Sequence, residues 1–167
     1  STKHIDPHNR TKTILCVGRL TKQKGYDLLI PAYAHSNCRS KGWKLAIVGH
    51  GEDFGQLQTL IQELGLSLTV SIHQPTPLLW EEFGNSSIFA MPSRYEGLPN
   101  ALLEAIAHGL IPFVSNRVGD LSSSIKSVDS HLVYDVNSLR DISEQLEWVT
   151  SHYQNFYTDD QPFLKLL

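Results

Sequence analysis

Short apolar runs alternate with segments of mixed polarity along most of the chain. The apolar runs predict six strands, at residues 13–18, 43–49, 68–73, 87–91, 111–115 and 131–134. The segments between and after them predict helices at residues 26–37, 54–64, 77–85, 99–108, 120–127 and 138–151. Nearly continuous apolar runs are typical of parallel strands that are covered on both faces. The pattern therefore predicts an α/β domain, a doubly wound parallel sheet of about six strands flanked by helices, with right-handed crossovers.

Composition narrows the class of protein. The chain has 167 residues and a formal net charge of −3, so we expect no surface for nucleic acid or for an anionic membrane. Its two cysteines are Cys16, inside a predicted strand, and Cys38, at the end of a predicted helix. These positions do not suggest a disulfide, and unpaired cysteines fit a reducing, cytoplasmic compartment.

The two ends of the chain differ from its middle. Residues 1–10 are polar and predict a linker or a cut end, whereas residues 11–167 predict one domain with its own core. The sequence has no signal peptide and no apolar run long enough to cross a bilayer. The last residues, FLKLL, form an apolar tail without an obvious partner. We therefore expect a piece of a longer protein.

The first candidate site residues follow the first predicted strand. Ligands of doubly wound sheets bind at the carboxyl ends of the strands, so the loops that begin there are the places to search. In the first such loop, Gly18 allows a sharp turn, and Arg19 and Lys24 lie close to the next helix. Arginine offers a planar fork of donors and lysine a compact charge, and both suit phosphate oxygens. The alternative is that both are ordinary surface cations.

The second and third loops carry weaker signals. Gly49 and Gly51 form a short Gly-x-Gly turn that would let backbone approach a ligand, but the full dinucleotide-binding fingerprint is absent. The third loop begins at His73, whose backbone is a candidate for contact with a nucleotide base. Trp80, in the helix that follows, is expected to pack on the sheet.

The fourth loop combines a helix N-terminus with two carboxylates. Pro99 suits a first helical turn, and a helix N-terminus attracts anions. The backbone N–H groups that lie there belong to Gly97, Leu98 and Asn100. Glu104 stands among apolar residues, so we expect it to be at least partly buried and to need hydrogen-bond donors.

Glu96 and Glu104 would lie about 12 Å apart if both belonged to one helix. A pair that acts on one glycosidic bond is roughly 5–10 Å apart, and nothing here requires such a pair. The arrangement better suits two contacts on one extended ligand, since each carboxylate can accept from two neighbouring hydroxyls. The alternative for Glu104 is a buried acid that caps a neighbouring loop.

Taken in order, the motifs resemble those of GT-B glycosyltransferases of family 4. Glu96 and Glu104 match the E-x7-E signature within PSRYEGLPNALLEAIAHG, and the first loop matches G-R-x4-K-G. The resemblance implies the carboxyl-terminal, Rossmann-like half of a GT-B enzyme, which binds a nucleotide-diphosphate sugar. It further implies transfer of the glycosyl group to an acceptor hydroxyl with retention of configuration.

The resemblance also implies roles for individual residues. Arg19 and Lys24 would hold the diphosphate, Glu96 the hydroxyls of the transferred sugar and Glu104 the ribose diol. Gly18, Gly49, Gly51, His73, Gly97, Leu98 and Asn100 would line the donor site. No metal and no other cofactor is expected. The chain departs from the family in having His50 where an acidic residue is common, and Gln74-Pro75 where a glycine is usual.

The resemblance implies an absent partner as well. GT-B enzymes bind the acceptor on an amino-terminal domain, so we expect this chain to be inactive alone. Synthesis of a cell-surface polysaccharide or glycoconjugate is the expected pathway, in the cytoplasm, with membrane contact only through the missing half at its inner face. Two alternatives stay open: a sugar-nucleotide epimerase of the same architecture, and a non-catalytic nucleotide-binding module.

Overall fold

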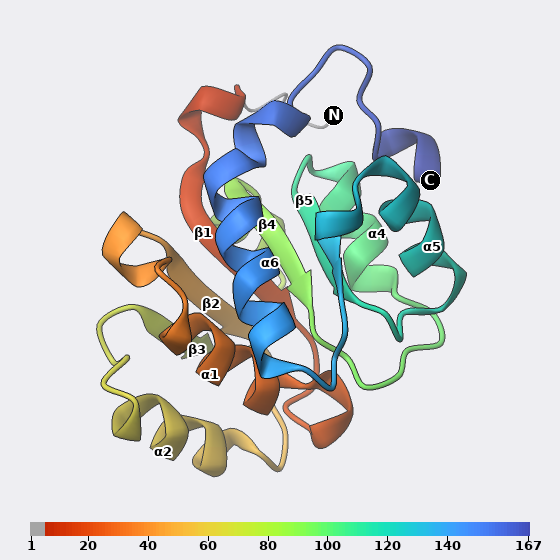
Figure 1. Ribbon diagram of the computed structural model, residues 1–167. Coiled ribbons are helices and arrows are strands. Elements are labelled where there is room, and N and C mark those ends of the chain that lie inside the picture. Colours follow the sequence, from red (N-terminus) through yellow and green to blue (C-terminus); the bar gives the residue numbers. More distant parts are fainter. Residues whose placement is uncertain (1–5) are drawn as a thin grey trace.

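The computed structural model describes residues 6–167 and contains one fully parallel, six-stranded sheet (Figure 1). The strands are β1 (Thr11–Val17), β2 (Lys44–Val48), β3 (Val70–His73), β4 (Ser86–Met91), β5 (Ile111–Ser115) and β6 (Val133–Tyr134). They lie in the order β3-β2-β1-β4-β5-β6, which is the strand order of a Rossmann fold. The predicted fold class is confirmed.

Helices connect the strands and follow the last one. They are α1 (Tyr26–His35), α2 (Phe54–Glu63), α3 (Leu79–Phe83), α4 (Asn100–Ala107), α5 (Gly119–Val128) and α6 (Leu139–His152). Figure 1 shows α6 returning across the sheet to lie beside α1, while α4 lies behind the sheet. In residues 6–167, no helix has both the length and the apolar character needed to cross a bilayer.

The clearest differences from the predicted element boundaries concern the third strand, the third helix and the sixth strand. The third strand begins at Val70, because α2 ends in a Schellman turn at Gly65 and leaves Leu68 93% exposed. The Leu66 N–H closes that turn on the Ile61 carbonyl at 2.9 Å. The third helix is shorter than predicted and begins at Leu79, after Pro75 and Pro77. The sixth strand is only two residues long, because residues 130–132 form a 3₁₀ turn.

The core lies on both faces of the central strands. Every residue of β4 is buried, and the middle of β1 is fully enclosed at Ile14, Leu15 and Cys16. Cys16 and Cys38 are both free and buried, which agrees with the expected absence of a disulfide. The nearly continuous apolar pattern of these strands thus has the physical cause that the sequence suggested.

Arg10 is held by the body of the domain, although the sequence placed it in a linker. Its guanidinium donates to the carbonyls of Gly84 at 3.0 Å, Ser86 at 2.9 Å and His108 at 2.6 Å. These bonds join the end of α4 to the start of β4. Of the rest of the predicted linker, Pro7–Asn9 form a short 3₁₀ helix, and residues 1–5 lie outside the described residues.

Close packing joins the loop after β1 to the loop after β4. Gly25, the residue before α1, has a φ of +73°, and a Cβ at this position would lie 1.8 Å from the Pro92 carbonyl oxygen. Two separate reasons therefore require glycine at position 25: its left-handed backbone angle and the lack of space for a side chain. This contact brings the start of α1 against the loop that leaves β4.

We predict that Gly25→Ala destabilises the domain much more than Gly42→Ala. Gly42 also has a left-handed φ, of +85°, but a Cβ added there would meet no neighbouring group within 4 Å. Gly42→Ala should therefore cost only the left-handed backbone penalty of about 1–2 kcal/mol. Gly25→Ala adds a collision with backbone, and overpacking typically costs ~1–3 kcal/mol more. Chemical denaturation measures both, and equal losses would contradict the proposed packing.

Candidate functional site

The strand order reverses between β1 and β4, and the loops that leave these strands lie next to each other. From β1 the chain proceeds to β2 and β3 on one side, and from β4 it proceeds to β5 and β6 on the other. Ligands of open α/β sheets bind at such a reversal. The two loops, residues 18–25 and 92–99, contain most of the candidate site residues that the sequence indicated.

Lys24 and Glu96 form an ion pair across this reversal. Lys24 Nζ lies 2.9 Å from Glu96 Oε2, and the two side chains are only 18% and 8% exposed. The Ser93 hydroxyl donates to the same oxygen at 3.0 Å. The structure therefore brings together a cation and a carboxylate that the sequence placed on different loops. Sequence reasoning missed Ser93, because a serine after a strand carries no signal of its own.

Arg94 fastens the same two loops to each other. Its guanidinium makes two parallel hydrogen bonds with the Asp27 carboxylate, at 2.8 and 2.9 Å, and also donates to the Lys22 carbonyl. The backbone N–H of Arg94 donates to the Gln23 carbonyl at 2.8 Å. Hydrogen bonding to Asp27 raises the pKa of Arg94. This clamp was also missed, because its two side chains are 67 residues apart in the sequence.

Arg19 and Gly18 lie at the other end of the β1 loop. The Arg19 side chain is exposed and makes no ion pair or side-chain hydrogen bond with any residue in the range 6–167. A Cβ on Gly18 would lie 2.8 Å from the Tyr26 hydroxyl and 3.3 Å from Lys24 Cε. Gly18 therefore leaves space for Lys24 and Tyr26. Burial, reinforced by Cys16 and Glu96, raises the pKa of Tyr26 well above its ordinary value.

The Gly-x-Gly turn after β2 packs against the β1 loop. A Cβ on Gly49 would lie 1.9 Å from the Gly18 carbonyl oxygen, and one on Gly51 would lie 2.6 Å from the Leu20 carbonyl oxygen. The Leu20 N–H donates to the His50 carbonyl at 2.9 Å. Close backbone approach explains both glycines without a ligand. Their predicted part in lining a site stays a prediction.

His73 ends the edge strand and is separated from β1 by β2. Its carbonyl accepts from the Gly49 N–H at 2.9 Å, and its ring meets Phe83 edge-on with centroids 5.1 Å apart. Ser71 Oγ lies 2.8 Å from His73 Nε2. The structure therefore places His73 at the carboxyl ends of the strands, as it does the other loop candidates. Its side-chain contacts, however, are with Ser71 of its own strand and Phe83 of α3.

The loop before α4 offers two backbone donors. The helix begins at Asn100, one residue later than predicted, and Pro99 is the residue before it. The Asn100 N–H donates to the Leu98 carbonyl at 2.9 Å, so it is already used. The N–H groups of Gly97 and Leu98 have no acceptor among the described residues. Two of the three predicted donors are thus available to an anion.

The expected burial of Glu104 is wrong, because its side chain is exposed. The buried residues of α4, Leu102, Ala105 and Ile106, face the sheet, and Glu104 occupies the outer side of the helix. Its hydrogen-bond donor is Trp80, whose Nε1 lies 2.9 Å from Glu104 Oε2. Trp80 also stacks on His108, with ring centroids 4.4 Å apart, so its main polar and aromatic contacts are with α4.

A metal site needs several His, Cys, Asp or Glu side chains close together. Within residues 6–167, no group of three or more His, Cys, Asp or Glu side chains is placed to hold a metal ion. The expectation that no metal takes part stays a prediction.

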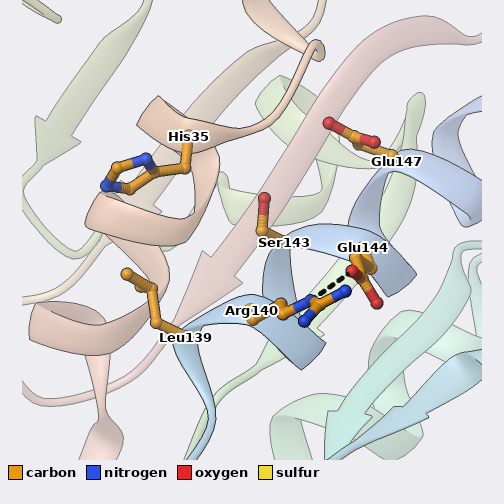
Figure 2. A pocket seen from close by; sticks show the side chains of 6 residues that line it. All are labelled: His35, Leu139, Arg140, Ser143, Glu144 and Glu147. Atoms are coloured by element: carbon orange, nitrogen blue, oxygen red, sulfur yellow. Dashed lines mark hydrogen bonds and ion pairs between the residues drawn. The ribbon is translucent and has the colours of Figure 1, made fainter.

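Two hollows on the surface lie away from these candidates. One encloses about 360 Å³ and lies between α1 and α6 (Figure 2). At this hollow, Arg140 Nε donates a hydrogen bond to Glu144 Oε1 at 2.7 Å. It is lined by His35, Leu139, Arg140, Ser143, Glu144 and Glu147. The other encloses about 630 Å³ and extends from Lys22 and Asp27 along α2. None of the candidate site residues lines either hollow.

Comparison with known proteins places these motifs in a family. Residues 2–157 match the family model described as glycosyl transferases group 1. The amylovoran biosynthesis glycosyltransferase AmsD of Erwinia amylovora is 40% identical over 97 residues, which are 58% of this chain and 27% of that protein. An uncharacterised glycosyltransferase of Haemophilus influenzae is 29% identical over 136 residues, which are 81% of this chain and 38% of that protein.

A solved structure shows the same fold. The carboxyl-terminal domain of a glycosyl transferase group 1 family protein, LpcC of Francisella tularensis, superposes with a TM-score of 0.77 at 20% identity. The match covers 92% of this chain and 83% of that one. The chain thus has the fold of such a carboxyl-terminal domain, and it spans well under half of each of the two curated relatives.

We predict that Lys24 and Glu96 are energetically coupled. Glu96→Gln leaves a largely buried ammonium without its counter-charge, and breaking such a pair costs about 3 kcal/mol. The variants Lys24→Met and Glu96→Gln, alone and together, should give a coupling free energy above about 1 kcal/mol in chemical denaturation. The exposed pair Arg140–Glu144 is the control and should show coupling near the detection limit. Additive losses for Lys24 and Glu96 would show that the pair does not hold the loops together.

Proposed function

The chain belongs to the family of glycosyl transferases group 1, and we propose that it is the donor-binding half of a GT-B glycosyltransferase. Its ligand is a nucleotide-diphosphate sugar. The observation that carries this proposal is the Lys24–Glu96 ion pair, which lies where the strand order reverses. Next to it in the sequence are the N–H groups of Gly97 and Leu98, which have no acceptor within residues 6–167. The cation suits a negatively charged part of such a ligand, and the carboxylate suits a part that is rich in hydroxyls.

The diphosphate would be bound by cations and backbone donors together. An ammonium group has three N–H donors, and Lys24 uses one of them to donate to Glu96 Oε2. Arg19 adds an exposed guanidinium, the loop before α4 adds the N–H groups of Gly97 and Leu98, and the α4 N-terminus adds its partial positive charge. Donors fixed in advance stabilise the charge that grows on the departing diphosphate in the transition state. We propose that this arrangement acts without a metal.

The two carboxylates would bind the hydroxyl groups on either side of the diphosphate. Lys24 and Ser93 both donate to Oε2 of Glu96, and Oε1 has no donor among the described residues. We assign that oxygen to hydroxyls of the transferred sugar. Glu104, on the outer side of α4, would accept from the ribose diol. The nucleotide base would then extend towards His73 at the edge strand.

We propose retention of configuration at the anomeric carbon, with attack on the face from which the diphosphate leaves. The acceptor would be bound by an amino-terminal domain of the same protein. A role in making a polysaccharide or glycoconjugate is supported by the relative named for amylovoran biosynthesis. We place the reaction in the cytoplasm, with any contact to the inner face of a membrane made by the other half of the enzyme.

Nucleotide binding is the first test. UDP, GDP and ADP are screened by thermal shift, because a ligand that binds the folded state raises its unfolding midpoint. Arg19→Ala should leave the midpoint without nucleotide unchanged and weaken the best ligand at least tenfold, since a hydrogen bond to a charged group contributes about 1.5–3 kcal/mol. Lys22→Ala is the control, because Lys22 already pairs with Asp53. No binding of any of the three by the unmodified chain, or full binding by Arg19→Ala, would contradict the proposal.

Catalysis is the second test. The chain alone, incubated with labelled nucleotide sugars and candidate acceptors, should bind donor but form no glycoside, because the acceptor-binding half is absent. Glycoside formation by this chain would show that the roles are wrongly divided between the two domains. An epimerised nucleotide sugar as product would instead favour an epimerase of the same architecture.

A further inference from the structure

We propose that Trp80 is a positioning residue that fixes the Glu104 carboxylate for the ribose diol. The inference rests on the proposed function, since it concerns the ribose end of the same site. Trp80 belongs to α3 and Glu104 to α4, and the indole Nε1 lies 2.9 Å from Glu104 Oε2. None of the motifs that identify the family includes this tryptophan.

An exposed glutamate needs such a partner if it is to hold a ligand in one geometry. A free glutamate side chain loses up to about 2 kcal/mol of rotamer entropy when it is fixed, and a ligand that fixes it must supply that free energy. The bond from Trp80 fixes the carboxylate before the ligand arrives. An indole N–H can only donate, and a carboxylate can accept from the indole and from hydroxyls at the same time.

The bond leaves enough acceptor capacity for a diol. An ionised carboxylate has about four lone-pair positions, and Trp80 occupies one of them on Oε2. Oε1 has no donor among the described residues. Two neighbouring hydroxyls can therefore still be accepted, one by each oxygen.

Trp80 is itself fixed by the helix that carries Glu104. Its ring stacks on His108 with centroids 4.4 Å apart and planes 10° from parallel. His108 Nδ1 lies 2.8 Å from the Glu104 carbonyl oxygen, which can only accept, so this nitrogen carries the proton. The His108 carbonyl in turn accepts from Arg10. Stacking sets the position of the indole, and its N–H then sets the position of the carboxylate.

The alternative to a positioning role is a purely structural role for Trp80. In that case the indole would only join α3 to α4 by stacking on His108, and its N–H would not matter to a ligand. Trp80→Phe separates the two roles, because phenylalanine keeps a ring on His108 and loses the donor. Trp148→Phe is the matched control, since Trp148 stacks between His131 and His152, with centroids 3.8 and 4.3 Å away.

The experiment compares the nucleoside diphosphate that binds best with its 2′-deoxy and 3′-deoxy forms. The unmodified chain should prefer the ribose form at least about tenfold, the value of one hydrogen bond to a charged acceptor. Trp80→Phe should lower this preference at least about threefold while changing the affinity for the deoxy forms less than twofold. Glu104→Gln should abolish the preference, and adding Trp80→Phe to it should have no further effect. Trp148→Phe should keep the preference of the unmodified chain.

A spectroscopic signal reports the hydrogen bond without any ligand. The ¹⁵N-labelled indole N–H of Trp80 should shift in Glu104→Gln, and the Trp148 signal should not. An unshifted Trp80 signal, or a full ribose preference in Trp80→Phe, would overturn the positioning role while leaving the proposed function intact. Failure of the unmodified chain to bind any nucleotide would contradict the proposed function, and the positioning role with it.

Discussion

A largely buried ion pair, between Lys24 and Glu96, joins the two loops on which the proposed site depends. Each charge alone would be expensive to bury, so each is stable where it lies because the other is present. Arg94 and Asp27 hold the same loops from outside, and Gly25 lets them pack together. The charges of the proposed site are therefore fixed by contacts between the two loops at the strand-order reversal.

The sequence predicted the strands and their loops well, because burial on both faces leaves a simple apolar pattern. It also singled out Lys24 and Glu96, since both belong to short local motifs, and the structure places these two side chains together. It could not predict that Arg94 pairs with Asp27 or that Trp80 reaches Glu104, because such pairs join residues that only the fold brings together. The burial expected for Glu104 was wrong for a related reason. Apolar neighbours in the sequence say little about which side of a helix one residue occupies.

Glycine has two different uses at this edge of the sheet. Gly18, Gly49 and Gly51 are explained by close approach of backbone or side chains, so a glycine-rich turn is not by itself a sign of ligand binding here. The N–H groups of Gly97 and Leu98, by contrast, have no acceptor among residues 6–167. Neither of the two hollows described above coincides with the candidate residues.

In the proposed function, a diphosphate binds where the β1 and β4 loops meet. Amide ¹H–¹⁵N spectra recorded while a nucleoside diphosphate is added test it most directly, because they report every backbone N–H separately. We expect the largest shifts at Gly97 and Leu98 and in residues 18–25. Shifts confined to the hollow between α1 and α6, with these loops unchanged, would contradict it (Figure 2).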